Sequence, residues 1–209
     1  MSRSVQGATV VAAILIFVGV WYFAFRTTSP GSVANYPSSG TDIIAFGDSL
    51  VAGNGSTHGN DFVSVLSKKT GQTIVNLGVP GDTTAAGLAR LHELDQYHPK
   101  VVLLLLGGND HLRNVPTATT FANLSTIIEN IESRGAIVLL LGVKGSLFGD
   151  QFAPEFERLH TKYNTAFVSN VLEGLFGKEK YMSDEVHPND LGYTVIADRV
   201  YPVLVPLLN

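Results

Sequence analysis

Four short apolar runs, separated by longer stretches with helical spacing, constrain the fold of this chain more than any other feature of its sequence. The runs lie within Asp42–Gly55, Thr73–Gly81, Lys100–Asp110 and Ala136–Gly145. Between them, Thr83–Gln96 carries leucines three residues apart, and Thr119–Arg134 repeats apolar residues at helical spacing. Buried strands that alternate with amphipathic helices are typical of βα units. The sequence therefore predicts an α/β protein with a mostly parallel sheet.

The first three runs end in the same way, with glycine beside a polar residue. Ser49 follows the first run, Gly78 lies at the end of the second, and Asn109 follows the third. One glycine after a strand usually marks only a turn. In open parallel sheets, however, ligands bind beyond the carboxyl ends of the strands. Three such ends on one edge therefore indicate a functional site.

Acyl-transfer chemistry would use this edge, because it needs a hydroxyl nucleophile and donors already directed at the developing oxyanion. Ser49 can supply the hydroxyl. Its own N–H and that of Gly78 can supply two donors, since glycine lets the backbone approach closely. The side-chain amide of Asn109 can supply the third.

The general base must come from the six histidines of the chain. These are His58, His92, His98, His111, His160 and His187. Only His187 has an evident orienting acid, because Asp184 precedes it by three residues and Pro188 restricts the local backbone. Such Asp-x-x-His pairs also cap helices or form surface contacts. The stretch at 188–190 in addition predicts the start of a helix over Leu191–Leu208, which is compatible with both interpretations.

Composition argues against several functions. The chain carries 14 Lys and Arg against 18 Asp and Glu, without a basic stripe, so a nucleic-acid partner has little electrostatic support. The absence of cysteine excludes disulfides, thiolate zinc sites and cysteine nucleophiles. The histidines lack a metal-ligand spacing such as H-E-x-x-H, so neither a metal nor an organic cofactor is implied.

The N-terminal part differs from the rest of the chain. Ala8–Phe25 is an uncharged run of 18 residues, which as a helix reaches about 27 Å, close to the thickness of a bilayer core. We predict a membrane anchor at 1–25, a flexible tether at 26–40 and one folded domain at 41–209. The flanking charges favour a domain on the extracytoplasmic side. A cleaved signal peptide is the alternative, and the protein would then be secreted.

The blocks FGDSL, NLGVPGDTT, LLLLGGND and SDEVHPN occur in this order along the chain. Together they resemble the four signature blocks of the GDSL esterases, also called SGNH hydrolases, over about Thr41–Asn209. In detail the chain is most similar to the bacterial thioesterase, lysophospholipase and arylesterase branch of that family. The resemblance implies a flavodoxin-like three-layer α/β/α sandwich with a five-stranded parallel sheet.

The same resemblance assigns roles to five residues. It implies Ser49 as the nucleophile, His187 as the general base and Asp184 as the residue that orients the base. It also implies Gly78 and Asn109 as oxyanion donors beside the Ser49 amide. Because all five are present, the predicted function is two-step hydrolysis of carboxylic esters or thioesters, such as lysophospholipids, acyl thioesters or aryl esters.

Five further residues are predicted to flank the acyl pocket, because they follow the third and fourth apolar runs: His111, Leu112, Val115, Leu147 and Phe148. Their apolar surroundings suit an acyl chain. The alternative is that these side chains only close the core beneath the loops. Carbohydrate O-acetylesterase or O-acyltransferase activity would use the same catalytic residues. A non-catalytic, membrane-anchored binding protein is the other class left open. A monomeric catalytic domain is expected.

Overall fold

The computed structural model describes residues 32–144 and 151–209. The strands are β1 (Asp42–Gly47), β2 (Ile74–Gly78), β3 (Pro99–Leu105), β4 (Ile137–Leu141) and β5 (Ala166–Val168). The helices are α2 (Ser49–Ala52), α3 (Phe62–Thr70), α4 (Thr84–Ala89), η2 (Leu91–Gln96), α5 (Gly108–Leu112), α6 (Thr117–Ser133), α7 (Phe152–Tyr163), α8 (Asp190–Leu204) and η3 (Val205–Leu208). The predicted anchor at 1–25 lies outside the described residues, as do Leu147 and Phe148.

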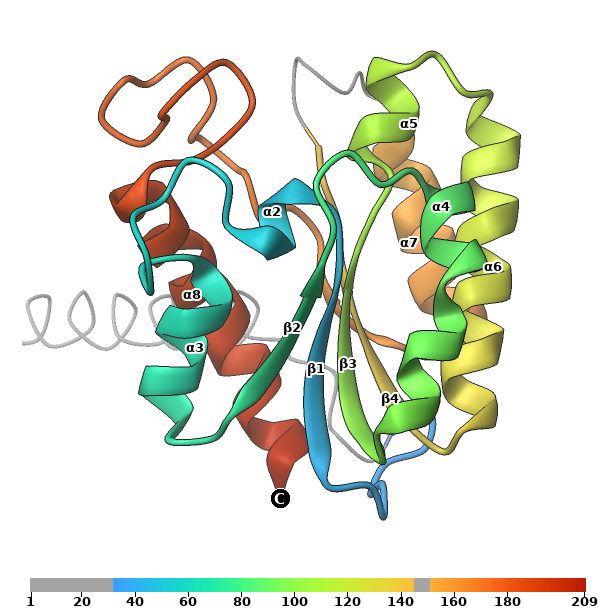
Figure 1. The fold of residues 1–209 in the computed structure, drawn as a ribbon. Coiled ribbons are helices and arrows are strands. Elements are labelled where there is room, and N and C mark those ends of the chain that lie inside the picture. Colours follow the sequence, from blue (N-terminus) through green and yellow to red (C-terminus); the bar gives the residue numbers. More distant parts are fainter. Residues whose placement is uncertain (1–31, 145–150) are drawn as a thin grey trace, which may run out of the picture.

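The five strands form one parallel sheet in the order β2-β1-β3-β4-β5 (Figure 1). The prediction of βα units is confirmed, because each of the four apolar runs forms a strand. In the sheet, Gly47 pairs with Gly78 on one side and with Leu105 on the other, so the carboxyl ends of three strands are level. The strand order reverses between β1 and β3, which is where ligands bind in sheets of this order.

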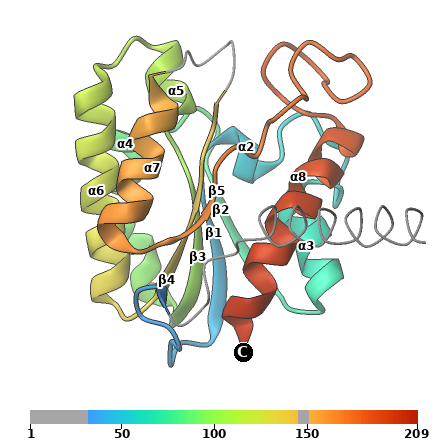
Figure 2. The ribbon, with the colours of Figure 1, turned by 180° about the vertical axis from the view of Figure 1, so that it is seen from behind.

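Helices cover both faces of the sheet. α3 and α8 pack together on one face, whereas α4, α6 and α7 cover the other (Figures 1 and 2). The expected apolar stripe of α6 is buried and consists of Phe121, Leu124, Ile127, Ile128 and Ile131. Layers of this kind bury both sides of the sheet, and β3 and β4 are accordingly apolar at almost every position.

The helical stretch predicted over 83–96 is not one helix. It divides at Arg90 into the α-helix α4 and the 3₁₀-helix η2. The leucines at 88, 91 and 94 repeat every three residues, which is the period of a 3₁₀-helix rather than that of an α-helix. The spacing therefore indicated a helical stretch correctly but concealed the change of helix type at Arg90.

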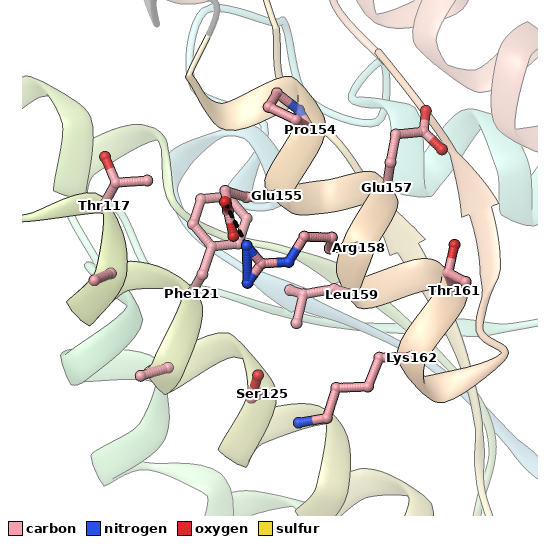
Figure 3. Close-up of a pocket in the computed structure, with 12 residues that line it drawn as sticks. Thr117, Phe121, Ser125, Pro154, Glu155, Glu157, Arg158, Leu159, Thr161 and Lys162 are labelled. Carbon is pink, nitrogen blue, oxygen red and sulfur yellow. Dashed lines mark hydrogen bonds and ion pairs between the residues drawn. The ribbon is translucent and has the colours of Figure 1, made fainter.

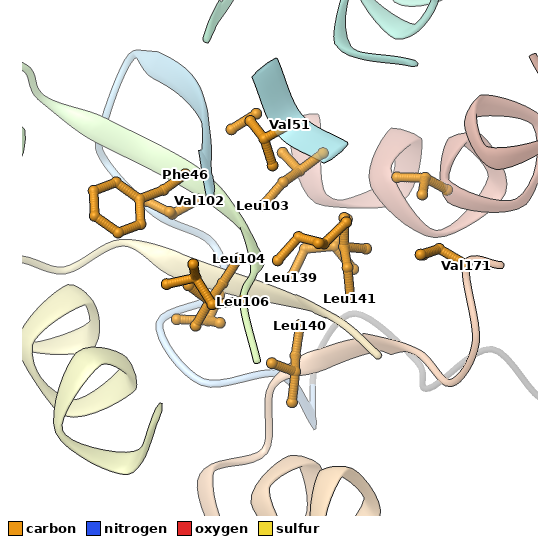
Figure 4. Close-up of a cluster of buried hydrophobic side chains, with 14 of the residues drawn as sticks. Phe46, Val51, Val102, Leu103, Leu104, Leu106, Leu139, Leu140, Leu141 and Val171 are labelled. Atoms are coloured by element: carbon orange, nitrogen blue, oxygen red, sulfur yellow. The ribbon is translucent and has the colours of Figure 1, made fainter. Parts of the chain in front are cut away.

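The core extends to the edge of the sheet that carries the polar residues. Successive residues of the inner strands, such as Leu103 and Leu104, point to opposite faces and meet side chains from both helical layers (Figure 4). Val51 of the short helix α2 is fully buried in the same cluster. The helix that begins with Ser49 is thus anchored in the core.

Part of the predicted tether belongs to the folded domain. Val33 is only 5% exposed and packs in the core. The amide of Ala34 donates to the carbonyl oxygen of Asn164, and Nδ2 of Asn35 donates to those of Glu132 and Ala136. These contacts lie at the amino ends of β4 and β5, at the lower edge of Figure 1. The packed domain therefore begins at about Val33 rather than at Thr41.

The predicted C-terminal helix is confirmed as α8, continued by η3. Among the described residues, Asp190–Leu208 is the one helical stretch whose length and composition would allow it to span a membrane. Its residues Tyr193, Ile196, Val200 and Leu204, however, are fully buried within the domain. The helix therefore serves as a core helix, and its apolar character is explained by packing.

Candidate active site

Ser49 lies where β1 meets α2, at the first position of this four-residue helix. Asp48 caps the helix, because its Oδ1 accepts a hydrogen bond from the Leu50 amide at 3.0 Å. A glycine is needed just before it: a Cβ at Gly47 would lie 2.2 Å from the carbonyl oxygen of Leu105 in β3. The turn therefore presents the Ser49 hydroxyl at the carboxyl edge of the sheet.

The Ser49 hydroxyl begins a series of hydrogen bonds. Its Oγ lies 3.0 Å from Nε2 of His187, and Nδ1 of the same ring lies 2.8 Å from Oδ2 of Asp184. Because an ionised carboxylate can only accept hydrogen bonds, Nδ1 carries the ring proton. Nε2 is then left as an acceptor for the serine hydroxyl. The three side chains predicted to act together are thus in contact.

Asp184 is held as a carboxylate by its own turn. Its Oδ1 accepts hydrogen bonds from the amides of Val186 at 2.8 Å and His187 at 2.7 Å. Burial alone would raise the pKa of Asp184. The hydrogen bonds from the His187 ring and from these two amides outweigh that effect and lower the pKa below its ordinary value. The acid therefore remains ionised beside the imidazole at neutral pH.

Two residues at the amino end of α8, Asn189 and Tyr193, hold the two segments that meet at the catalytic hydrogen bond. Asn189 caps α8 by accepting from two amides of the first turn, and its Nδ2 donates to the Met182 carbonyl oxygen at 3.3 Å. The buried Tyr193 donates its hydroxyl to the carbonyl oxygen of Asn54 at 2.7 Å. Asn54 follows the helix of Ser49, so both ends of the catalytic hydrogen bond are tied to α8.

The predicted oxyanion donor Gly78 has a different role. Its N–H donates to Oδ1 of Asn76 at 2.9 Å, and Gly78 does not border the cavity beside Ser49. A Cβ at this position would lie 2.2 Å from the backbone nitrogen of Ala52 in α2. The close approach expected of this glycine exists, but it is made to the helix that carries Ser49. The assignment of Gly78 as an oxyanion donor is therefore corrected.

Three residues further on, Gly81 does border that cavity. It lies in the turn 79–82, in which the Asp82 amide donates to the Val79 carbonyl oxygen at 3.1 Å and Gly81 has φ +85°. With proline before the glycine, this is the arrangement of a type II turn, whose closing bond does not use the Gly81 N–H. Asn109 borders the same cavity. The sequence signal for this turn is the Pro-Gly pair.

The cavity beside Ser49 has a volume of about 210 Å³. Its apolar wall consists of Leu50, Pro80, Leu112 and Val186. Of the predicted pocket residues, Leu112 therefore borders it, and its side chain is exposed. His111 instead packs edge-on against Phe152, with ring centroids 5.5 Å apart, and Val115 does not border the cavity. The roles of His111 and Val115 beside the acyl group stay predictions.

A larger hollow of about 1020 Å³ lies between α6 and α7 (Figure 3). Phe121 and Leu159 contribute apolar side chains to it, and Arg158 crosses it in an ion pair with Glu155. None of the three side chains of the Ser49 series borders this hollow. Size alone therefore does not identify the reactive site in this molecule.

The fold and the site together define a class of protein. A serine hydroxyl, an imidazole and a carboxylate bonded in series at the carboxyl edge of a parallel sheet are the arrangement of a serine hydrolase. Within residues 32–144 and 151–209, no three histidine or acidic side chains are grouped so that they could hold a metal ion.

Comparison with known proteins identifies the family. The model of the GDSL-like Lipase/Acylhydrolase family matches residues 45–195. Esterase TesA of Pseudomonas aeruginosa is 33% identical over 178 residues, which cover 79% of this chain and 89% of that protein. Thioesterase 1/protease 1/lysophospholipase L1 of Escherichia coli K12 is 30% identical, with 80% and 85% covered.

Solved structures agree with this result. The psychrotrophic esterase EstA from Pseudoalteromonas sp., whose crystal structure was determined inhibited by monoethylphosphonate, superimposes with a TM-score of 0.71 at 26% identity. The match covers 78% of this chain and 96% of that one. The chain therefore belongs to the GDSL-like lipase/acylhydrolase family, as the four sequence blocks predicted, and is a serine hydrolase that acts on ester bonds.

Proposed function

We propose that this protein hydrolyses acyl esters and acyl thioesters through a covalent intermediate on Ser49, with His187 as general base and Asp184 as the residue that orients it. The observation that carries the proposal is the hydrogen-bonded series from Ser49 Oγ through the His187 ring to Asp184, with distances of 3.0 and 2.8 Å. Both distances lie within the range needed for proton transfer and for orientation of the base.

In the first step, Ser49 Oγ attacks the carbonyl carbon while its proton passes to Nε2 of His187. The tetrahedral intermediate then collapses, and the leaving alcohol or thiol takes that proton from the ring. In the second step, His187 deprotonates a water molecule that attacks the acyl-enzyme, and the acid is released as Ser49 recovers its proton. Asp184 stabilises the imidazolium that forms in both steps and does not itself become protonated.

The oxyanion hole is assigned to the amide of Ser49, the amide of Gly81 and Nδ2 of Asn109. All three residues border the 210 Å³ cavity. Neither amide has a hydrogen-bond acceptor among the described residues. Preorganised donors of this kind stabilise the charge that develops in the transition state, and the loss of one typically costs about 2.7–4 kcal/mol.

The cavity supports an acyl substrate whose ester group lies in the cavity and whose chain extends beyond it. Its 210 Å³ is below the roughly 300–1,000 Å³ of pockets that enclose a whole small-molecule ligand. A longer acyl chain would therefore leave the cavity past Leu112, a residue that is 48% exposed. The same small cavity favours O-acetyl groups of carbohydrates as a second candidate substrate class, and it is consistent with transfer to an alcohol instead of water.

The N-terminal segment is proposed to anchor the domain to a membrane. The chain enters the domain at Val33, at the amino ends of the strands, whereas Ser49 lies at their carboxyl ends (Figure 1). β3 alone has seven residues, or about 23 Å at 3.3 Å per residue. An anchor at 1–25 would thus join the domain at the edge opposite to the site.

The test compares the full chain with Ser49→Ala on p-nitrophenyl esters from acetyl to palmitoyl, acetylated sugars, lysophospholipid and an acyl thioester. Ser49→Ala should retain only trace hydrolysis and should no longer be labelled by a fluorophosphonate. Ser133→Ala, which removes an exposed hydroxyl of α6 that bonds to the carbonyl oxygen of Asn130, is the matched control and should keep both properties. Undiminished turnover by Ser49→Ala would exclude the proposal. The acyl-length profile separates the acyl-ester and O-acetyl candidates.

A further inference from the structure

The turn on the oxyanion side of the site is held by one nearly buried arginine. The side chain of Arg90 is 12% exposed, and its Nε donates to Oδ2 of Asp82 at 2.6 Å. Its Nη2 donates to the carbonyl oxygens of Gly47 at 2.9 Å and Leu77 at 3.0 Å. The guanidinium lies over the ring of Phe46, 4.0 Å from the centroid. One side chain thus connects the ends of β1 and β2 to the turn that follows β2.

Two of these contacts, those with Gly47 and Asp82, lie close to residues proposed to act in catalysis. Gly47 lies two positions before Ser49 and, in addition, its carbonyl oxygen accepts the amide of Val79 at the start of the turn. Asp82 follows Gly81 directly. The backbone carbonyl oxygen of Asp82 accepts a hydrogen bond from Nδ2 of Asn109 at 2.9 Å.

This hydrogen bond defines the orientation of the Asn109 amide. The amide group is planar and has two hydrogens on Nδ2, so fixing one of them on the Asp82 carbonyl oxygen also fixes the direction of the other. Gly81 is bonded to Asp82 through the backbone, so the direction of its N–H follows the same turn. The placement of Asp82 therefore controls two of the three proposed oxyanion donors.

We propose that Arg90 is a positioning residue that holds the oxyanion donors in register with the Ser49 nucleophile, a role that rests on the proposed function. Arginine suits this role because its planar, permanently charged fork donates in several fixed directions, whereas lysine offers a point charge. The burial of the Arg90–Asp82 pair makes it costly to remove one partner alone. A displacement of about 1 Å in such donors can reduce the rate about a hundredfold.

The test is a double-mutant cycle of Arg90→Met and Asn109→Ala in the full chain, measured as kcat and KM on p-nitrophenyl acetate. Arg90→Met alone should lower kcat about 10- to 100-fold with KM changed less than about threefold, because the donors act on the transition state. In the Asn109→Ala background, Arg90→Met should lower kcat further, but by less than about one third of the fold-change that it causes in the wild type. Arg90→Lys should recover less than half of the lost activation free energy.

Arg134→Met is the matched control, because Arg134 also pairs with an aspartate but does so at the surface, with Asp95. It should leave kcat unchanged. If Arg90→Met does not fold, Asp82→Asn replaces it in the same cycle, since this change keeps the volume and replaces the charged acceptor of Arg90 with a neutral amide. An unchanged kcat, or losses that multiply independently of Asn109, would overturn the proposal. Full activity of Ser49→Ala would instead refute the proposed function, so the two failures are distinguishable.

Discussion

Asp48 should make the domain less stable as the pH rises, and Asp48→Asn should remove this effect. The side chain is 2% exposed, and its burial raises its pKa to about 7 from an ordinary value of 3.8. The nearby carboxylates of Asp82 and Asp110 raise it further, whereas the Leu50 amide and His187 oppose the shift. Below about pH 4 the carboxyl is protonated in both the folded and the unfolded chain. Between about pH 4 and 7, only the folded chain keeps the proton, so the free energy of unfolding falls.

The magnitude follows from the shift. A difference of about 3 pKa units corresponds to about 4 kcal/mol at 1.36 kcal/mol per unit. Asparagine keeps the oxygen that accepts the Leu50 amide and cannot ionise. The stability of Asp48→Asn relative to the wild type should therefore increase by up to about 4 kcal/mol between pH 4 and pH 8. Titrating groups that do not interact with Asp48 cancel because both proteins contain them.

Urea unfolding of both proteins at each pH unit from 4 to 8 measures this difference. Glu132→Gln is a useful comparison. The pKa of the Glu132 carboxyl is also raised to about 7, by burial and by the neighbouring Glu129. Glu132 is less buried than Asp48 and lies at the opposite end of the sheet. Glu132→Gln should show the same sign and a smaller effect. A stability difference between Asp48→Asn and the wild type that stays constant within about 0.5 kcal/mol over this range would refute the reasoning.

Two further predictions concern the loops and the N-terminus. Gly55→Ala should lower kcat about tenfold or more, because its Cβ would lie 2.2 Å from Oγ of Ser183 and 3.1 Å from Cβ of His187. Gly71 has a similar positive φ, but a Cβ there would meet nothing within 4 Å, so Gly71→Ala should lower the stability and leave kcat unchanged. Equal kcat values for Gly55→Ala and Gly71→Ala in steady-state assays would contradict this argument. The full chain should sediment with membranes after a carbonate wash, and recovery in the supernatant would argue against an anchor at 1–25.

The sequence predicts those parts of the site that depend on local pattern. The strands follow from apolar runs, and the position of Ser49 follows from where such a run ends. The partnership of Asp184 and His187 is also local, because they lie three positions apart in one turn. What the sequence alone does not provide is the 3.0 Å contact between Ser49 and His187, since 138 positions separate these residues. That contact was predictable only from the resemblance to a family.

Several of the incorrect or incomplete predictions share one physical cause, namely contacts between segments distant in sequence. The stretch 26–40 has the composition of a tether, yet Val33 finds a place in the core and Asn35 bonds to two carbonyl oxygens about 100 residues away. His111 follows a strand at the correct edge, but nothing local indicates its contact with the ring of Phe152, 41 positions further along the chain. Composition and periodicity contain no information on these contacts.

The glycines around the site show how far a signature residue can be interpreted. Gly78 is needed because the backbone of α2 passes 2.2 Å from where its Cβ would be. At Gly81 the nearest atom to a Cβ is 3.4 Å away, so the requirement there comes from φ +85° in the turn. Gly55 combines a positive φ with close contacts to the loop of His187. A glycine in a catalytic block therefore marks a constraint on the backbone near the reaction. Only the contacts of its N–H and of its missing Cβ determine whether it acts on the substrate or on the fold.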